Sequence, residues 1–395
     1  MFFSIKKIDV LLLARPDHSY SIYEKLLEQN KINYLYCCFK LLPLWSKKMI
    51  KSPRVRYYSK GYSNCFLLTF FHLARLKMDK PKWEKYEKFL FQLHLKLLLP
   101  FIKPSLVHYW PNYTMEIIRK YKKRNPDVKT FADVYFPCEQ WVIDNIKPLF
   151  EKYNLEMNMS KIERDAEKLK ELMQFEDNFI VPSPFVADTY RQYYPDKNYI
   201  LKPYGITKWN GYKKKSYKND SNEIKSFVYA GGSVTIEKGC DLLLEFFKNH
   251  PELELHVYGT VPTNQKSIFK VYENLSNINY HGLVPKSELQ AAFSGYDVGI
   301  HLSQYDAYSI SVGELLGAGL PVIVSDKTGI LYQVKEHKLG LVSSMDMESV
   351  CDRVSEITTP EVYNNILDNL DAFLNAPYVG YGDSIVAFYK EQIQD

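Results

Sequence analysis

Two carboxylates, Asp306 and Glu314, are separated by seven residues in the segment LSQYDAYSISVGELLGAGLPVIVSD at 302–326. This pattern predicts a polar loop that leads into a helix and then into a buried strand, with one acid at each end of the polar part. Backbone N–H groups at a helix start can bind an anion, and carboxylates can accept hydrogen bonds from sugar hydroxyls. The segment therefore indicates a binding site for a sugar attached to a phosphate.

The same segment resembles the E-x7-E signature of family-4 glycosyltransferases, which are retaining enzymes of the GT-B fold. Asp306 stands at the first acid of the signature and Glu314 at the second, while Tyr308 and Ser309 stand where Phe-Gly is common. The resemblance implies that Glu314 binds the ribose of the donor nucleotide and that Asp306 contacts the transferred sugar. It also implies phosphate contacts from the backbone around Ser309 and Ile310. The alternatives are a surface Glu favoured by the helix dipole and an Asp that only forms a turn.

The phosphates of a donor require a second element, and FVYAGGSVTIEKGCDLLLEFF at 227–247 is the candidate. It predicts a strand, a loop with Gly231 and Gly232, and a helix that follows Lys238. In the family that it resembles, an Arg and a Lys of this segment hold the diphosphate. Lys238 matches the Lys, whereas Gly232 and Ser233 occupy the neighbourhood of the Arg. Stabilisation of the leaving diphosphate is then expected from Lys238, helix N-termini and the Ser233 and Thr235 hydroxyls; the alternative is an ordinary turn with a solvated Lys.

Candidates for the acceptor side lie in the first half of the chain. Arg15 and His18 follow the first predicted strand and are equally suited to contact phosphate, to contact acceptor or to cap a helix. KTFADVYFP at 129–137 resembles the His-Asp stretch of the family, with Ala132 in place of the His. Asp133 remains a candidate for sugar or acceptor contact. His281 ends another predicted strand, and packing against a loop is favoured there over catalysis.

Strands and helices alternate almost throughout, which predicts an α/β protein with parallel sheets. We expect the GT-B arrangement, with two Rossmann-like doubly wound domains facing across a cleft at the carboxyl ends of their strands. The expected domains are 1–205 for the acceptor and 206–378 for the donor, and 379–395 forms a helix that crosses back to the first domain. Strands are predicted at 8–14, 32–39, 105–110, 129–135, 178–183, 226–231, 253–259, 278–282, 298–302, 321–326 and 340–342.

Composition and charge narrow the class of protein. The chain has 395 residues, of which 46% are hydrophobic and 25% charged, as in soluble two-domain proteins. Its six Cys show no C-x-x-C spacing and indicate reduced core thiols rather than a disulfide framework or zinc site. Residues 31–130 hold 22 Lys/Arg against 5 Asp/Glu, which predicts an anionic partner. Amphipathic basic stretches favour an anionic membrane surface, contacted through 40–103, and no nucleic-acid motif is present.

The resemblance implies a retaining glycosyltransferase, and with the charge pattern and the residues above we expect it to be metal-independent and peripheral on the cytoplasmic face of a membrane. It would move a hexose-type sugar from a nucleotide-sugar donor to a lipid-linked or polysaccharide acceptor in cell-surface glycan synthesis, with Lys238, Asp306 and Asp133 as catalytic candidates. No cofactor is expected, and the chain lacks the D-x-D triplet that other glycosyltransferases use to hold a metal. The alternatives are a nucleotide-sugar epimerase of GT-B fold and a degenerate, non-catalytic subunit, which the missing Arg and His would fit.

Overall fold

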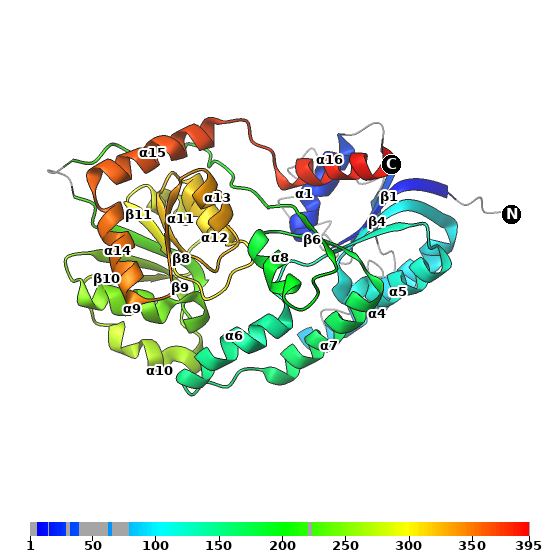
Figure 1. The fold of residues 1–395 in the computed structure, drawn as a ribbon, viewed down its shortest axis with the longest axis horizontal. Helices are drawn as coiled ribbons and strands as arrows, with labels where there is room; N and C mark the ends of the chain where they lie inside the picture. The colour runs from blue at the N-terminus through cyan, green and yellow to red at the C-terminus, as the bar shows by residue number, and fades with distance from the viewer. Residues whose placement is uncertain are drawn as a thin grey trace.

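The computed structural model describes residues 6–14, 16–28, 32–38, 62–64, 79–219 and 223–394, and these form two parallel β-sheets covered by helices (Figure 1). In the described residues the first sheet has the strand order β3-β2-β1-β4-β5-β6-β7 and the second the order β10-β9-β8-β11-β12-β13. Both orders run outward in two directions from a central strand, which is the doubly wound topology. The predicted fold class, two facing Rossmann-like domains, is confirmed.

The first sheet is buried on both faces. In β1 the side chains of Leu11 and Leu13 pack in one hydrophobic cluster, and those of Val10 and Leu12 pack in another with the helices at the two ends of the chain. Alternate residues of a strand face opposite sides, so an unbroken apolar run is what such a strand requires. The strands are β1 (Lys6–Ala14), β2 (Tyr34–Cys38), β3 (Tyr62–Asn64), β4 (Ile102–Tyr109), β5 (Lys129–Asp133), β6 (Asn178–Val181) and β7 (Asn198–Leu201). The helices are α1 (Pro16–Leu27), α4 (Lys80–Leu98), α5 (Pro111–Arg124), α6 (Glu139–Lys152), α7 (Met159–Phe175) and α8 (Pro184–Arg191).

The second sheet follows a segment without regular structure at 202–219. Its strands are β8 (Ser226–Ser233), β9 (Glu254–Thr260), β10 (Ile278–Gly282), β11 (Val298–His301), β12 (Val322–Ser325) and β13 (Gly340–Ser343). Its main helices are α9 (Cys240–Asn249), α10 (Lys266–Phe269), α11 (Lys286–Phe293), α12 (Ile310–Gly317), α13 (Leu331–Glu336), α14 (Met347–Ile357) and α15 (Pro360–Asn375).

The last helix, α16 (Tyr381–Gln394), lies beside α1 on the first domain (Figure 1). The two helices approach closely at Gly382, where an added Cβ would lie 2.3 Å from the backbone oxygen of Ser21. Lys25 of α1 forms an ion pair with Asp383 of α16, with 3.2 Å between Nζ and Oδ1. Ile385 and Tyr389 complete the cluster that covers this face of the first sheet. The C-terminal segment is therefore structurally part of the first domain.

The structure contains elements that the sequence pattern did not predict, and one predicted strand ends at a different residue. β7 and α6 were not predicted, and β7 is short with only one fully buried position, so its sequence carries little periodicity. The loop predicted to begin after Ala230 is instead part of β8, which continues to Ser233. A register shift between Ala230 and Gly232 lets the strand extend along β9 as far as Thr260. Such a bulge is compatible with glycine in a strand.

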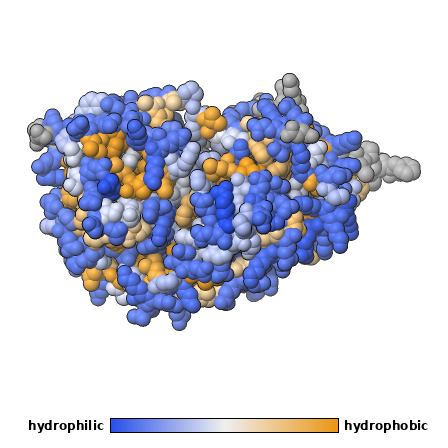
Figure 2. Space-filling model, viewed as in Figure 1, coloured by the Kyte–Doolittle hydropathy of each residue, from blue (hydrophilic) through white to orange (hydrophobic). Residues whose placement is uncertain are grey.

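The surface is that of a globular protein. On the face shown in Figure 2, hydrophilic residues cover most of both domains and hydrophobic patches lie among them. Within the described residues, none of the helices has the length and apolar content that crossing a membrane requires.

Candidate functional site

The two domains meet through the loop between β11 and α12. Ser183, at the start of α8, donates a hydrogen bond to the backbone oxygen of Ala307 at 2.6 Å. Phe136 and Trp141 of the first domain pack edge-on against Tyr305, with ring centroids 5.8 and 6.4 Å apart. The loop that contains Asp306 is therefore held at the carboxyl ends of both sheets, where ligands of doubly wound domains bind.

Lys238 and Asp306, which were predicted from separate segments, form an ion pair at the centre of this region. The distance from Lys238 Nζ to Asp306 Oδ2 is 2.6 Å, and the side chains are 28% and 18% exposed. Lys238 ends a short 3-10 turn, and its backbone N–H donates to the Thr235 hydroxyl at 3.3 Å. The turn is anchored at Gly239, where φ is +65° and an added Cβ would lie 1.5 Å from the Leu302 oxygen, so only glycine fits. This close approach fixes the cation opposite the carboxylate.

The other oxygen of Asp306 shapes the start of α12. Oδ1 accepts the backbone N–H groups of Tyr308 and Ser309, at 3.2 and 2.6 Å. Asp306 therefore stabilises the turn before α12 through one carboxylate oxygen and forms the ion pair with Lys238 through the other. Helical hydrogen bonding in α12 begins with Gly313 N–H to Ser309, so the N–H groups of Ile310 and the two residues after it are not used within the helix. These groups can receive an anion.

Electrostatics keep Asp306 ionised. Burial raises its pKa, but the His301 imidazole and the Lys238 ammonium outweigh burial and hold the pKa of this carboxyl well below its usual range. His301 Nε2 lies 3.7 Å from Asp306 Oδ2, and its ring stacks on Tyr229 at 5.7 Å. The negative charge of Asp306 thus stands beside the ammonium group of Lys238.

Glu314 lies one turn further along α12 and also faces a Lys. Its Oε1 is 2.5 Å from the Nζ of Lys286, at the start of α11. Lys286 is 73% exposed and Glu314 only 24% exposed. Because an exposed ion pair contributes little free energy, a ligand that hydrogen-bonds Glu314 can displace this Lys at small cost.

Tyr308 and Ser309 have different surroundings. The Tyr308 side chain is 3% exposed; its hydroxyl accepts the N–H of Gly205 at 2.8 Å and donates to Gln333 at 2.5 Å. Its hydroxyl is therefore bonded within the protein, as its backbone N–H is to Asp306, and contact of Tyr308 with a nucleotide sugar stays a prediction. Ser309 is in the left-handed conformation, with φ of 64°, and its buried hydroxyl has no hydrogen-bond partner within the described part of the chain. That hydroxyl is available to a ligand.

The two glycines at the end of β8 have different surroundings. An added Cβ at Gly231 would lie 1.9 Å from the Tyr229 hydroxyl, which donates a hydrogen bond to the Ser233 oxygen at 2.7 Å. Gly232 has φ of +72° and open space around the Cβ position. Gly232 and Ser233 stand where the family has an Arg, so this position supplies no positive charge. The segment can offer a phosphate its backbone, which is open at Gly232.

Asp133, the acid predicted in the first domain, is buried between β4 and the last helix of the chain. It is 3% exposed, and the Tyr381 hydroxyl of α16 donates to its Oδ2 at 3.1 Å. His108 Nε2 lies 3.4 Å from the same oxygen, and His108 Nδ1 shares a 2.6 Å hydrogen bond with Tyr389. Sequence reasoning missed His108, Tyr381 and Tyr389, because the only local signal was a His in an apolar strand. Asp133 is thus oriented by the C-terminal helix.

A cavity of about 770 Å³ opens at Asp133 and runs under α6 and α7. Its mouth includes Glu237 and Tyr305 of the second domain, so it adjoins the Lys238–Asp306 pair. The buried side of the cavity is apolar, with Val142 and Ile146 on α6 and Leu169 on α7. This volume lies within the range of about 300–1,000 Å³ that is typical of small-molecule sites.

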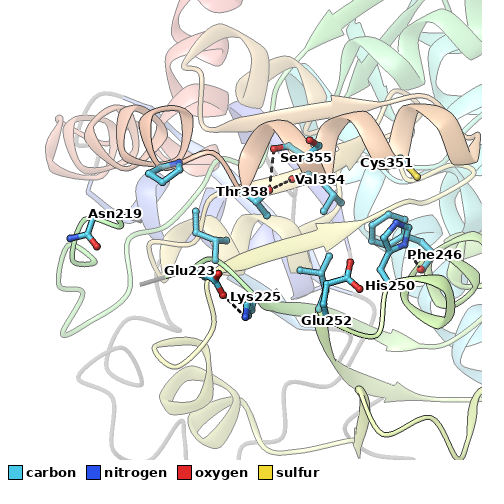
Figure 3. Close-up of a pocket in the computed structure, with 13 residues that line it drawn as sticks. Asn219, Glu223, Lys225, Phe246, His250, Glu252, Cys351, Val354, Ser355 and Thr358 are labelled. Carbon is cyan, nitrogen blue, oxygen red and sulfur yellow. Dashed lines mark hydrogen bonds and ion pairs between the residues drawn. The ribbon is translucent and has the colours of Figure 1, made fainter. Parts of the chain in front are cut away.

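A second cavity, of about 500 Å³, lies at the opposite edge of the second sheet (Figure 3). Lys225 and Leu253, which line it, precede β8 and β9, so it lies at the amino ends of the strands. Its other wall is α14, where Thr358 hydrogen-bonds back to Val354 and Ser355. The cavity is therefore at the other end of the strands from Lys238 and Asp306.

The remaining predicted positions are only partly visible. Arg15 lies outside the described residues, and His18 is in α1 but its side chain is not described. His281 stacks on Tyr258 and His256, with Nε2 3.0 Å from His256 Nδ1, at the end of β10. Most of the predicted membrane-contacting stretch at 40–78 is likewise outside the described residues. Among the residues that the structure describes, no group of three or more His, Cys, Asp or Glu is arranged to hold a metal ion.

Comparisons with known proteins agree with this geometry. Residues 212–365 match the family described as Glycosyl transferases group 1. Among solved structures, the chain is similar to the lipopolysaccharide outer core galactosyltransferase WaaB, with 13% identity over 98% of this chain and 99% of that one and a TM-score of 0.62. A sucrose-phosphate synthase from Thermosynechococcus elongatus gives 15% identity, 80% coverage of each chain and a TM-score of 0.58. Anabaena HepE, solved with UDP and glucose, gives 10% identity, coverage of 97% and 99%, and a TM-score of 0.56.

A comparison with the sequences of curated proteins finds no match. The fold is GT-B, and the family match falls on the domain that contains Lys238, Asp306 and Glu314. Fold and family match together support a glycosyltransferase, and thus glycosyl transfer as the class of reaction.

Proposed function

We propose that this protein is a retaining glycosyltransferase of family-4 type that uses a nucleoside-diphosphate sugar. The observation that carries the proposal is the arrangement on α12, where Asp306 with Lys238 stands at the N-terminus and Glu314 lies one turn further on. A diphosphate engages Lys238 and the unused N–H groups of α12, while ribose hydroxyls replace Lys286 at Glu314. The transferred sugar then lies beside Asp306.

The chemistry follows from this placement. The bond between the sugar anomeric carbon and the phosphate oxygen breaks, and an acceptor hydroxyl forms a new bond to that carbon on the same face. The leaving phosphate oxygen takes the acceptor proton, so no base from the protein is needed. The positive end of α12 and Lys238 stabilise the negative charge that grows on the diphosphate. The reaction needs no metal in this scheme, since the cationic groups of the chain take that part.

The comparisons support the choice of donor and product. HepE was solved with UDP and glucose, and WaaB is a lipopolysaccharide galactosyltransferase. Both are consistent with a hexose donor and a lipid-linked or polysaccharide acceptor in a cell-surface glycan. The Lys/Arg surplus of 31–130 supports a position on the anionic cytoplasmic face of a membrane.

Calorimetric titration with the nucleoside diphosphates UDP, GDP, ADP and CDP tests the proposal. One of these nucleotides is expected to bind the wild type, and Lys238→Met should weaken that nucleotide at least about tenfold because it removes a charged phosphate contact. Lys266→Met, at an exposed position of the same domain, is the matched control. The absence of binding by every nucleotide in the wild type would reject the enzyme and favour a non-catalytic subunit.

The epimerase alternative is separated by products. A transferase leaves most of the nucleotide sugar intact without acceptor, whereas an epimerase converts it. Chelation by EDTA should leave transfer unchanged; loss of transfer with EDTA and recovery with Mn²⁺ would refute metal independence.

A further inference from the structure

The cavity under α6 and α7 has a composition unlike that of the donor site. Three side chains of α6, Val142, Ile146 and Phe150, are at most 8% exposed and line it together with Leu169 and Leu172 of α7. Charged side chains line the cavity as well, among them Asp133, Glu139 and Lys168. A sugar or a polysaccharide would leave this apolar wall without suitable contacts, since hydroxyls buried there would lose hydrogen bonds.

The mouth of the cavity is placed for reaction. Glu237, which directly precedes Lys238 in the chain, lines it. The Gln265 side-chain amide donates a hydrogen bond to the Glu237 carboxylate at 2.9 Å. Asp133 and Tyr305 lie at the same end. A molecule that fills the cavity therefore presents its outer end to the sugar side of the donor site.

One outer wall of the cavity is α4, through Lys88 and Gln92. Next to Gln92 on α4, Phe89 is 59% exposed, and Leu97, further along the helix, is 60% exposed. Lys85 and Lys96 are exposed too and lie four and seven residues from Phe89, which places all of these on one side of a helix. Exposed large apolar groups among Lys are typical of a helix that lies on an anionic membrane surface. The helix that borders the cavity is thus suited to contact the bilayer.

Resting on the proposed function, we infer that the cavity under α6 and α7 binds the hydrocarbon chain of a membrane-lipid acceptor, whose hydroxylated head lies between Asp133 and the Lys238–Asp306 pair. The chain leaves the bilayer beside α4 and packs against Val142, Ile146 and Leu169. Burial of methylene groups supplies the affinity. The head supplies the hydroxyl that attacks the donor.

Binding of n-octyl β-D-glucoside, below the concentration at which it forms micelles, tests the inference by calorimetry, with glucose as the head-group control. The glucoside should bind the wild type and glucose should bind at least about tenfold more weakly, because each buried methylene contributes a severalfold gain in affinity. Val142→Phe and Leu169→Trp fill the cavity from opposite walls and should each weaken the glucoside at least about tenfold.

Two controls separate the cavity from other apolar surfaces. Cys351→Phe fills the cavity at the opposite edge of the second sheet, and Phe89→Ser changes the exposed face of α4. Both should keep wild-type affinity for the glucoside, while Phe89→Ser should reduce sedimentation with vesicles of anionic phospholipid. Equal glucoside binding by the wild type and both cavity variants would overturn the inference, as would binding of glucose as tight as that of the glucoside.

Nucleotide binding measured on the same samples shows whether a negative result contradicts the proposed function or only the lipid inference. Variants that fold should bind the nucleotide as the wild type does, because the donor residues lie in the other domain. If no nucleotide binds the wild type, the proposed function fails; if nucleotide binds and the glucoside does not enter the cavity, only the lipid inference fails.

Discussion

Asp306 and Asp133 stand on opposite sides of the same cleft and have opposite environments. Asp306 faces an ammonium group at 2.6 Å and two backbone N–H groups, so its charge is balanced. Asp133 faces the Tyr381 hydroxyl and the His108 ring and lines the cavity under α6 and α7. In the proposed function, the donor half of the cleft, around Lys238 and Asp306, receives phosphate and ribose, and the acceptor half, around Asp133, receives the acceptor.

The difference is also one of construction. The donor groups come from short segments at the strand ends of a single domain, whereas Asp133 is oriented by the last helix of the chain. A change in the donor half should therefore alter charge and nucleotide affinity directly. A change in the acceptor half should act through position.

The largest effect is expected at Lys238. Lys238→Met should lower the transfer rate about 10²–10³-fold, because a group that stabilises the leaving charge is lost. It should also lower the free energy of unfolding by about 3 kcal/mol, because Asp306 would remain buried without its cation. Steady-state rates and urea unfolding measure the two effects.

The double variant Lys238→Met/Asp306→Asn sharpens this result. It should recover most of the lost stability but none of the rate, since the unpaired charge is removed and the phosphate contact is not restored. Recovery of rate together with stability would show that Lys238 is only a structural partner of Asp306.

The next effect concerns Glu139, a carboxyl on the wall of the acceptor cavity. Burial raises its pKa from the ordinary value of 4.5 to about 7, and Asp165 adds to this while Lys168 opposes it. Below pH 4.5 both folded and unfolded states are protonated. As the pH rises to about 7 the unfolded state loses its proton first, so the folded state loses stability, and above this pH the loss is complete.

Glu139→Gln removes this titration. Relative to the wild type, the variant should gain about 3 kcal/mol between pH 4 and pH 8, because the pKa of Glu139 is about 7 in the folded state and 4.5 in the unfolded state. Urea unfolding at the two pH values measures the difference, and Glu171→Gln on the polar rim serves as control. The same offset between variant and wild type at both pH values would contradict an apolar environment for this acid.

These two halves also differ in how far the sequence could predict them. The loop, helix and strand that hold Asp306 and Glu314 are contiguous, so their spacing was visible in 302–326. Lys238 was found because its own segment has a recognisable turn, but its 2.6 Å contact with Asp306 joins residues 68 positions apart. Tyr381 lies 248 positions from its partner Asp133, and Tyr389 lies 281 positions from its partner His108. No local sequence pattern indicates either contact. Tertiary packing, not periodicity, brings them together.

A smaller effect is expected at Tyr381. Tyr381→Phe removes one hydrogen bond to buried Asp133 and should lower the free energy of unfolding by about 1–2 kcal/mol. If Asp133 serves the acceptor, kcat should fall while the affinity for nucleotide stays unchanged. Tyr378→Phe, three residues earlier and 51% exposed, is the control and should change neither. A change in nucleotide affinity in Tyr381→Phe would remove the separation between the two halves.

The smallest effect is expected at Lys286, whose ion pair with Glu314 is the exposed counterpart of the Lys238–Asp306 pair. Lys286→Ala should change stability by at most about 0.5 kcal/mol, because a Lys that is 73% exposed gains little from pairing in water. It should leave nucleotide affinity the same or raise it up to about twofold, because ribose no longer competes with the ammonium group for Glu314. Glu314→Gln in either background should lower affinity by the same factor if ribose is the ligand. If Lys286→Ala instead lowered affinity tenfold, the ammonium group would be a direct donor contact, and the donor half would hold two working cations rather than one.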